Sequence, residues 1–293
     1  MEKRKGIFFA AIAGISWGIT GVVGQFLFGE KGVSPEWLVS YRLLISGVIM
    51  LAYQLIKRKD IFEVWKNTQN RERLLIYSVF GMMAVQLSFF VAVRYSNAGT
   101  ATVLQYLNPM MMMLFFAVSR RIMPRKNEFL MVGLAIAGIF LIATKGNLHE
   151  LALSPLGLVW GLGCAVSTCL YSILPIKLLK QFDVLTICGW GMLLGGIALS
   201  ICVRPWTIHV AVDGQVIGCM VFLILFGTIL PFCCSLRAMP MIGPVYANLI
   251  SSVEPIVAAV LAFVVLGTKF AIPELIGFGL IISTIFLFAF DNQ

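Results

Sequence analysis

The sequence GTATVLQYLNPMMMMLFFAVS occupies residues 99–119 and decides how the rest of the chain is interpreted. It is a long apolar segment with polar residues and a proline near its middle. The second half of the chain repeats this design as VYANLISSVEPIVAAVLAFVV, residues 245–265. A helix in lipid has no reason to carry such groups unless they face something other than lipid. The two segments therefore predict a solute pathway built from two copies of one unit.

The composition indicates that the chain lies in a bilayer. The residues are 60% hydrophobic and only 12% charged, which is far more apolar than a soluble domain. Ten apolar segments are each close to the length of about 20 residues that crosses a membrane. They are residues 6–28, 37–56, 74–93, 98–119, 129–144, 156–178, 184–203, 216–236, 243–266 and 272–290. The sequence therefore predicts an all-α integral membrane protein with ten transmembrane helices, the first of which is retained and not cleaved as a signal peptide.

The net charge of +9 is distributed between alternating short loops. Sixteen Lys and Arg residues fall on the side of the N-terminus and five on the other side, and Arg42 lies within the second segment. This bias predicts a multi-pass protein of the plasma membrane with both termini in the cytoplasm. It gives no basic face for nucleic acid. The expected partners are the lipid bilayer and a small-molecule substrate; coupling to protons or another ion is left open, as is the choice between monomer and homodimer.

The residues that usually hold metals or cofactors are scattered. The seven cysteines all lie in predicted helices of the second half and include no Cys-x-x-Cys pair, while His149 and His209 fall in different loops. These patterns predict neither a disulfide framework nor a metal site, and no cofactor. The run Met110 to Met113 points around the whole helix, so flexible packing is the better interpretation.

An internal repeat relates the two halves. Aligning Pro109 with Pro255 gives an offset of 146 residues, and the same offset pairs Glu128 with Glu274. Each copy holds five helices, an odd number, so the second copy must enter the membrane from the opposite side. Inverted repeats are a recurrent architecture of secondary transporters. The predicted domains are two five-helix repeats, residues 1–146 and residues 147–293.

Short motifs in a fixed order carry a family resemblance over nearly the whole chain. They are Ile15-Ser16-Trp17-Gly18, Tyr41-Arg42-Leu43, Asn108-Pro109, Leu170-Tyr171, Glu254-Pro255 and Glu274-Leu275-Ile276-Gly277. With these motifs the chain resembles the EamA-type transporters of the drug/metabolite transporter superfamily. The resemblance implies ten helices in two inverted five-helix units and export of small metabolites. The chain departs from the family at Gly267-Thr268, where Gly-Glu is common.

The candidate substrate-binding residues are polar side chains on shared helical faces. Thr102, Gln105, Tyr106 and Pro109 follow the i, i+3, i+4, i+7 spacing of one face, and the equivalent positions of the second copy repeat the pattern. Buried polar groups without partners are costly, so these faces should line a cavity. Together with faces on other helices they give the set Trp17, Thr20, Gln86, Thr102, Gln105, Tyr106, Tyr171, Asn248 and Ser251. Helix packing is the competing interpretation, and it is favoured for Ser16, Ser167, Thr228 and Ser235.

Two charged residues are predicted at membrane depth. Arg42 lies about two turns into its helix, where snorkelling to the outer interface and a role in the pathway are equally supported. Glu254 projects about 110° away from the polar face of its helix at about 100° per residue. That angle disfavours direct contact with substrate and favours structural pairing or proton transfer.

Four prolines are predicted to bend their helices, because each removes a backbone hydrogen bond. They are Pro109, Pro175, Pro231 and Pro255. The carbonyls that they free would offer acceptors near the middle of the membrane.

The leading functional hypothesis is secondary active transport, in the export direction, of small organic metabolites such as amino acids or related compounds, by alternating access. One alternative is a multidrug or quaternary-ammonium transporter, for efflux or uptake, that holds organic cations through cation–π contact with Trp17, Tyr106 and Tyr171. The absence of a carboxylate from the membrane-embedded part of the first helix weakens it. A membrane scaffold or enzyme is the non-transport alternative. No paired nucleophile and base supports an enzyme.

Overall fold

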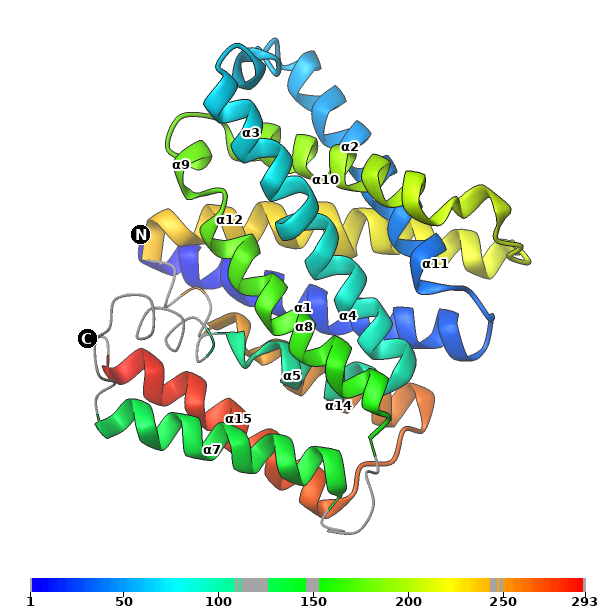
Figure 1. Cartoon of the computed structure of the whole chain (residues 1–293), viewed down its shortest axis with the longest axis vertical. Coiled ribbons are helices and arrows are strands. Elements are labelled where there is room, and N and C mark those ends of the chain that lie inside the picture. Colours follow the sequence, from blue (N-terminus) through cyan, green and yellow to red (C-terminus); the bar gives the residue numbers. More distant parts are fainter. Residues whose placement is uncertain are drawn as a thin grey trace.

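The structure, a computed structural model, describes residues 2–108, 111, 126–145, 153–242, 247 and 250–291. These ranges contain helices and no strand, so the all-α prediction is confirmed for them (Figure 1). The main helices are α1 (Glu2–Gly29), α2 (Pro35–Ile56), α3 (Thr68–Ile76), α4 (Ala84–Tyr95), α5 (Ala98–Gln105), α7 (Lys126–Thr144), α8 (Pro155–Ile173), α9 (Ile176–Leu179), α10 (Val184–Val203), α11 (Gly214–Ile224), α12 (Leu230–Ile242), α14 (Val253–Leu266) and α15 (Ile272–Asp291).

Six helical stretches are long and apolar enough to cross a membrane. They are Glu2–Gly29, Pro35–Ile56, Thr68–Tyr95, Pro155–Leu179, Val184–Val203 and Gly214–Ala238. Three shorter apolar helices are Val132–Thr144, Val253–Leu266 and Ile272–Thr284. The fourth predicted segment starts as α5 and continues into residues outside the described ranges, so the total of ten helices stays a prediction.

Side-chain caps fix where several helices begin. Ser34 caps α2 by accepting from the backbone N–H of Trp37, and Pro35 occupies the first turn. Asn97 caps α5 and Asp213 caps α11 in the same way. These residues satisfy backbone donors that have no partner within the helix. Asp213 also accepts from Lys31 at 2.7 Å, and this hydrogen bond lowers the pKa of its carboxyl group.

The helices pack in pairs around a central group. Helices α2 and α10 form one pair and α7 and α15 the other, and Figure 1 shows the two pairs on opposite sides of the bundle. Glycines allow close approach in both pairs. A Cβ on Gly47 would lie 2.5 Å from the backbone nitrogen of Leu193, and one on Gly138 would lie 2.9 Å from the carbonyl oxygen of Gly277. Between the pairs, α1 packs on α12 and α14, while α8 packs on α4 and α5.

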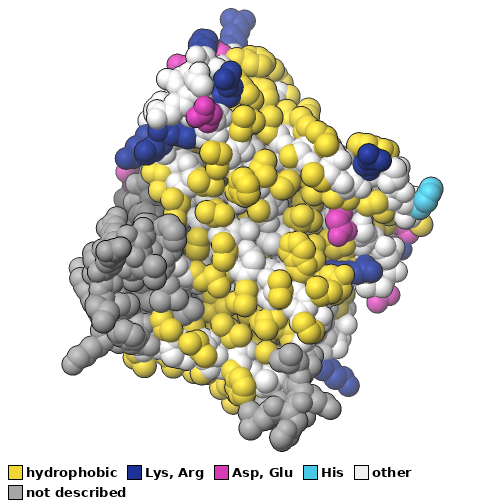
Figure 2. Space-filling view, viewed as in Figure 1, with side chains coloured by type: hydrophobic (Ala, Val, Ile, Leu, Met, Phe, Trp, Pro, Cys, Tyr) yellow, Lys and Arg dark blue, Asp and Glu magenta, His cyan; other side chains and the backbone are white. Residues whose placement is uncertain are grey.

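The outer surface suits a lipid environment. Large apolar side chains are exposed along the helices, for example Phe8, Val159, Phe263 and Val264. Figure 2 shows hydrophobic side chains over most of the visible face, with the charged side chains at its margins. An exposed apolar surface of this kind is expected where a bilayer, and not water, surrounds the protein.

Besides the turn between α8 and α9, four local irregularities interrupt the central helices. Two are π-helical turns, at Tyr77–Met83 between α3 and α4 and at Leu225–Ile229 between α11 and α12. The other two are breaks: Tyr106 and Leu107 form a turn after α5, and Ser252 is a turn residue directly before α14. Residues 106 and 252 are related by the same offset of 146 that pairs Pro109 with Pro255. Helix irregularities of this sort often mark functional sites.

Gln25 links α1 to the loop after α14 and to the start of α5. Gln25 donates to the Thr268 hydroxyl at 2.9 Å and accepts from the backbone N–H of Ala98 at 2.8 Å. Thr268 stands where the resemblance leads one to expect glutamate. With threonine at this position, the chain has a hydrogen bond between α1 and the loop after α14.

Candidate functional site

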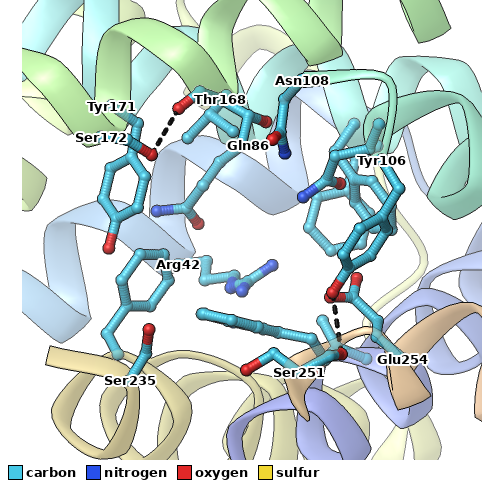
Figure 3. A pocket seen from close by; sticks show the side chains of 17 residues that line it. Arg42, Gln86, Tyr106, Asn108, Thr168, Tyr171, Ser172, Ser235, Ser251 and Glu254 are labelled. Carbon is cyan, nitrogen blue, oxygen red and sulfur yellow. Dashed lines mark hydrogen bonds between the residues drawn. The ribbon is translucent and has the colours of Figure 1, made fainter. Parts of the chain in front are cut away.

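One buried cavity lies among the central helices and is lined by residues from α1, α2, α4, α8, α12 and the two helix breaks (Figure 3). Its wall combines aromatic rings with polar groups. The lining residues are Trp17, Thr20, Arg42, Val85, Gln86, Phe89, Phe90, Gln105, Tyr106, Asn108, Thr168, Tyr171, Ser172, Phe232, Ser235, Ser251 and Glu254. An apolar wall with a few converging polar groups is the usual form of a small-molecule site.

Arg42 extends from α2 into this cavity and is only 2% exposed. Its Nε donates to the Thr228 hydroxyl, and its Nη2 donates to the Gly227 carbonyl at 2.8 Å. The guanidinium carbon lies 4.9 Å from the centre of the Phe90 ring. The side chain is therefore buried at the cavity and does not extend to the surface; its role in a pathway stays a prediction.

A proline explains why the Gly227 carbonyl is available to Arg42. Pro231, four residues later, has no N–H to donate back to it. The surrounding turn is π-helical, and the Thr228 hydroxyl donates to the carbonyl of Leu223, five residues earlier, at 2.8 Å. The carbonyl that Pro231 frees thus becomes an acceptor inside the protein, as predicted from the sequence.

Tyr106 joins the two helix breaks. Its hydroxyl donates to the Ser251 carbonyl at 2.8 Å and its oxygen lies 3.1 Å from Oε2 of Glu254. Ser251 is four residues before Pro255, so this carbonyl is also freed by a proline. The Ser251 hydroxyl in turn donates to the Ala10 carbonyl of α1 at 3.0 Å. The two segments singled out by the repeat therefore meet directly at the cavity.

The expected position of Glu254 is wrong. The carboxylate lines the cavity and is 3% exposed, beside Tyr106. The prediction projected Glu254 along one regular helix, but Ser252 is a turn residue with ψ of 2°, and α14 begins only at Val253. The break rotates Glu254 toward the side of the helix that the regular projection assigned to uncharged residues.

Most of the other candidates reach the cavity wall. Trp17, Thr20, Gln86, Gln105, Tyr106, Tyr171 and Ser251 all line it. Thr102 does not: it is fully buried and its hydroxyl donates to the Ala98 carbonyl one turn back, at 2.7 Å. That local bond satisfies the polar group without a cavity. Asn248 lies outside the described residues.

The four residues assigned to packing divide into two groups. Ser235 lines the cavity, contrary to expectation. Thr228 binds Arg42 behind the cavity wall. The hydroxyl of Ser167 donates to the Gly163 carbonyl of its own helix at 2.8 Å. Ser16 contributes its backbone carbonyl, which accepts from the Thr20 hydroxyl at 2.8 Å.

Of the four prolines predicted to bend helices, the three that are described coincide with irregular helix geometry. Pro175 occupies the position directly before the short α9, after the end of α8. Pro231 follows the π-helical turn, and Pro255 lies in the first turn of α14, after the break at Ser252. Pro109 lies outside the described residues.

Several cavity residues were not predicted as substrate contacts. From α4 these are Val85, Phe89 and Phe90; from elsewhere they are Asn108, Thr168, Ser172 and Phe232. Gln86, Phe89 and Phe90 follow the i, i+3, i+4 spacing, so a search from Gln86 along its own helical face would have found them. The sequence indicated Asn108 only as part of the Asn108-Pro109 motif.

Three buried polar atoms at the cavity have no hydrogen-bond partner. They are Nη1 of Arg42, Oε1 of Gln86 and the hydroxyl of Tyr171. Most buried polar groups in proteins are paired, so each exception calls for an explanation. A ligand in the cavity would provide their partners.

The described residues offer little for metal or disulfide chemistry. Among them no group of three or more His, Cys, Asp or Glu side chains is close enough to hold a metal ion. All seven cysteines are free thiols.

Comparison with known proteins shows consistent similarity to transporters. YicL of Salmonella typhimurium, named an uncharacterized inner membrane transporter, is 34% identical over 292 residues, covering 100% of this chain and 97% of YicL. YyaM of Bacillus subtilis, named an uncharacterized transporter, is 23% identical over 258 residues, covering 85% of this chain and 82% of YyaM. A solved crystal structure shares the fold with a TM-score of 0.64 at 17% identity, covering 98% of this chain and 96% of the other.

The family pattern spans nearly the whole molecule. The EamA-like transporter family matches residues 4–144 and 155–290. Together with the apolar helices and the full-length similarity to YicL, this match defines a multi-pass membrane transporter. The chain belongs to the EamA-like transporter family.

Proposed function

We propose that this transporter is a secondary active exporter of small organic metabolites, such as amino acids or related compounds, and that it works by alternating access. The observation that carries the proposal is the cavity, where Arg42, Gln86 and Tyr171 each present a buried polar atom without a partner. Ser40, Ser46, Trp65 and Ser200 also carry such atoms away from the cavity, so what distinguishes these three is that they converge on one cavity. A pathway needs them for its solute.

The packing of the helices supports two inverted repeats. Helix α1 contacts α12 and α14, and in the other half α8 contacts α4 and α5. A shift of about 146–151 residues converts the contact of α1 with α12 into that of α8 with α4. The two outer pairs, α2 with α10 and α7 with α15, join equivalent helices. Such exchange is expected for a pseudo-twofold axis in the membrane plane, around which transporters alternate their access.

The two helix breaks lie beside the cavity, where alternating access would require the helices to bend. Tyr106 and Ser252 interrupt equivalent helices, and both breaks adjoin the cavity. Discontinuous helices at the repeat interface are typical of substrate sites in secondary transporters. We place both termini in the cytoplasm, since the excess of basic residues lies on that side. A reporter fused to the C-terminus that is active only in the cytoplasm tests this orientation.

Organic cations are the second candidate substrate class. Glu254 supplies a carboxylate, and the rings of Trp17, Tyr106, Tyr171 and Phe232 surround the same space. These groups favour a cation. The buried charge of Arg42 in the same cavity opposes one, because like charges repel strongly where water is excluded.

Flux through purified protein in liposomes tests the proposal. Vesicles loaded with radiolabelled amino acids, other small metabolites or quaternary ammonium compounds should lose at least one solute faster than protein-free vesicles. Acceleration by the same solute placed on the other side would indicate alternating access. Flux equal to the empty-vesicle leak for every candidate would overturn transport, and flux of cations alone would favour the second candidate.

A further inference from the structure

The buried charge of Arg42 lacks a counter-ion. No carboxylate among the described residues pairs with it, and its two hydrogen-bond partners, the Thr228 hydroxyl and the Gly227 carbonyl, are neutral. An isolated charge in a buried site is costly unless an anion and hydrogen bonds compensate it. Cation–π contact with Phe90 offsets only part of this cost. The side chain is thus held in place with its charge unbalanced.

The guanidinium is aimed so that its free donor faces the cavity. Nε and Nη2 are fixed at the π-helical turn, whereas Nη1 is buried without a partner. Figure 3 shows the Arg42 guanidinium in the middle of the cavity, between the wall that carries Gln86 and Tyr171 and the wall that carries Tyr106 and Glu254. Because two donors are anchored on the protein, the third is pre-positioned for an acceptor on a ligand.

The neighbouring polar groups define that ligand further. The unpartnered hydroxyl of Tyr171 can donate to an anion. Gln86 donates weakly to the sulfur of Met82 at 3.6 Å, so its free Oε1 presents an acceptor. The Glu254 carboxylate is a second acceptor at the cavity. The wall therefore offers donors for an anionic group and acceptors for a protonated one.

We propose that Arg42 and Tyr171 bind the carboxylate of the transported solute, and that Gln86 and Glu254 receive its ammonium group. The substrate class is then zwitterionic amino acids, with the side chain against the rings of Trp17, Phe89 and Phe232. This inference rests on the proposed transport function and adds the residues that select the substrate. Charge-assisted hydrogen bonds from arginine to a carboxylate are among the strongest in proteins.

Thermal unfolding of the purified full-length protein tests the inference with matched probes. Each series holds the side chain constant and varies the charge: leucine, leucinamide and 4-methylpentanoate; phenylalanine, phenylalaninamide and 3-phenylpropanoate; alanine, alaninamide and propanoate. A ligand that binds the folded state raises the melting temperature. In at least one series the zwitterion should stabilise most and the carboxylate without ammonium less, while the amide leaves the melting temperature unchanged.

Two variants assign the effect to the cavity. Arg42→Gln should weaken binding of the stabilising probe about 30-fold or more. Tyr171→Phe removes only a hydroxyl without a partner, so it should fold normally and weaken binding about tenfold. The matched controls are Arg71→Gln, an exposed arginine on α3, and Tyr95→Phe, an exposed tyrosine at the end of α4 outside the cavity. Both controls should bind like the wild type.

Several outcomes would overturn the inference. One is stabilisation by amides equal to that by carboxylates, and another is no stabilisation by any carboxylate. The third is an unchanged affinity for the probe in both Tyr171→Phe and a folded Arg42→Gln. Failure of transport itself gives a different pattern. In that case a carboxylate would bind in an Arg42-dependent manner, while liposome flux would equal the leak for every solute.

Discussion

Prolines on neighbouring helices determine what Arg42 and Tyr106 bind. Pro231 leaves the Gly227 carbonyl without its helical donor, and Arg42 donates to this carbonyl instead. Pro255 likewise leaves the Ser251 carbonyl without a donor, and Tyr106 donates to it. A buried carbonyl without a donor is costly. Each proline therefore provides a free carbonyl, and the hydrogen bond to that carbonyl holds Arg42 or Tyr106 at the cavity wall.

The two cavity tyrosines should respond oppositely to loss of their hydroxyl. Tyr106→Phe leaves the buried Ser251 carbonyl without a donor, and we expect it to cost about 1–3 kcal/mol of folding free energy. Tyr171→Phe removes a buried hydroxyl without a partner, so its stability should be unchanged or slightly higher. Melting temperatures in one detergent check this, with the exposed Tyr95→Phe as control. Equal melting temperatures for Tyr106→Phe and the wild type would contradict the assigned hydrogen bond.

For single residues, the sequence predicted several side chains that line the cavity, but not the direction of side chains next to an irregular turn. Trp17, Gln105 and Tyr171 could be placed because each lies on a polar face of a regular helix. Glu254 could not, since one turn residue at Ser252 changes the angle between it and the preceding face. Thr102 was misplaced because its bond to a carbonyl of its own helix has no signature in residue spacing.

Close packing of α1 brings the second helix break to the cavity. A Cβ on Gly14 would lie 2.5 Å from the Ser251 carbonyl oxygen, and one on Gly18 would lie 2.8 Å from that of Glu254. Small residues one turn apart let two helix backbones approach in this way. Any larger residue at Gly14 would push away the same carbonyl that accepts the Tyr106 hydroxyl.

Gly14→Ala should therefore reduce both stability and flux. We expect a loss of about 1–3 kcal/mol from overpacking, seen as a lower melting temperature. The control is Gly163→Ala on α8, where an added Cβ meets nothing within 4 Å. It should be neutral or stabilising by up to about 1 kcal/mol, because alanine favours helix over glycine. If both variants behave alike, close backbone contact at Gly14 is not what positions the break.

The helical elements themselves could be predicted closely, but the irregular turns could not. The predicted segment 184–203 matches α10 at both ends, because Asp183 caps it and the apolar run is uninterrupted. The π-helical turns at Tyr77–Met83 and Leu225–Ile229 lie inside long, mostly apolar segments. Each contains a glycine that is closely packed, Gly81 against Tyr77 and Gly227 against Thr20. No apolar periodicity distinguishes them from regular helix.

The molecule as a whole places one polar cavity inside an apolar shell. Two glycine-packed pairs, α2 with α10 and α7 with α15, flank the central helices (Figure 1). Residues from both halves of the chain line the cavity. The six spans and the family membership agree with the membrane class predicted from composition. The inverted repeat remains our proposal, supported by the exchange of helix contacts between the halves.

The central claim, that solute passes through this cavity, is tested most directly by blocking it at Ser235. In a flux-competent background without the seven native cysteines, Ser235→Cys on α12 places a thiol on the cavity wall, and exposed His209→Cys is the control. The measurement is liposome flux of the best-transported solute before and after treatment with a membrane-impermeant, charged thiol reagent. We predict that labelling abolishes flux only in Ser235→Cys and that excess solute slows the labelling. Undiminished flux through fully labelled Ser235→Cys protein would contradict a pathway through the cavity.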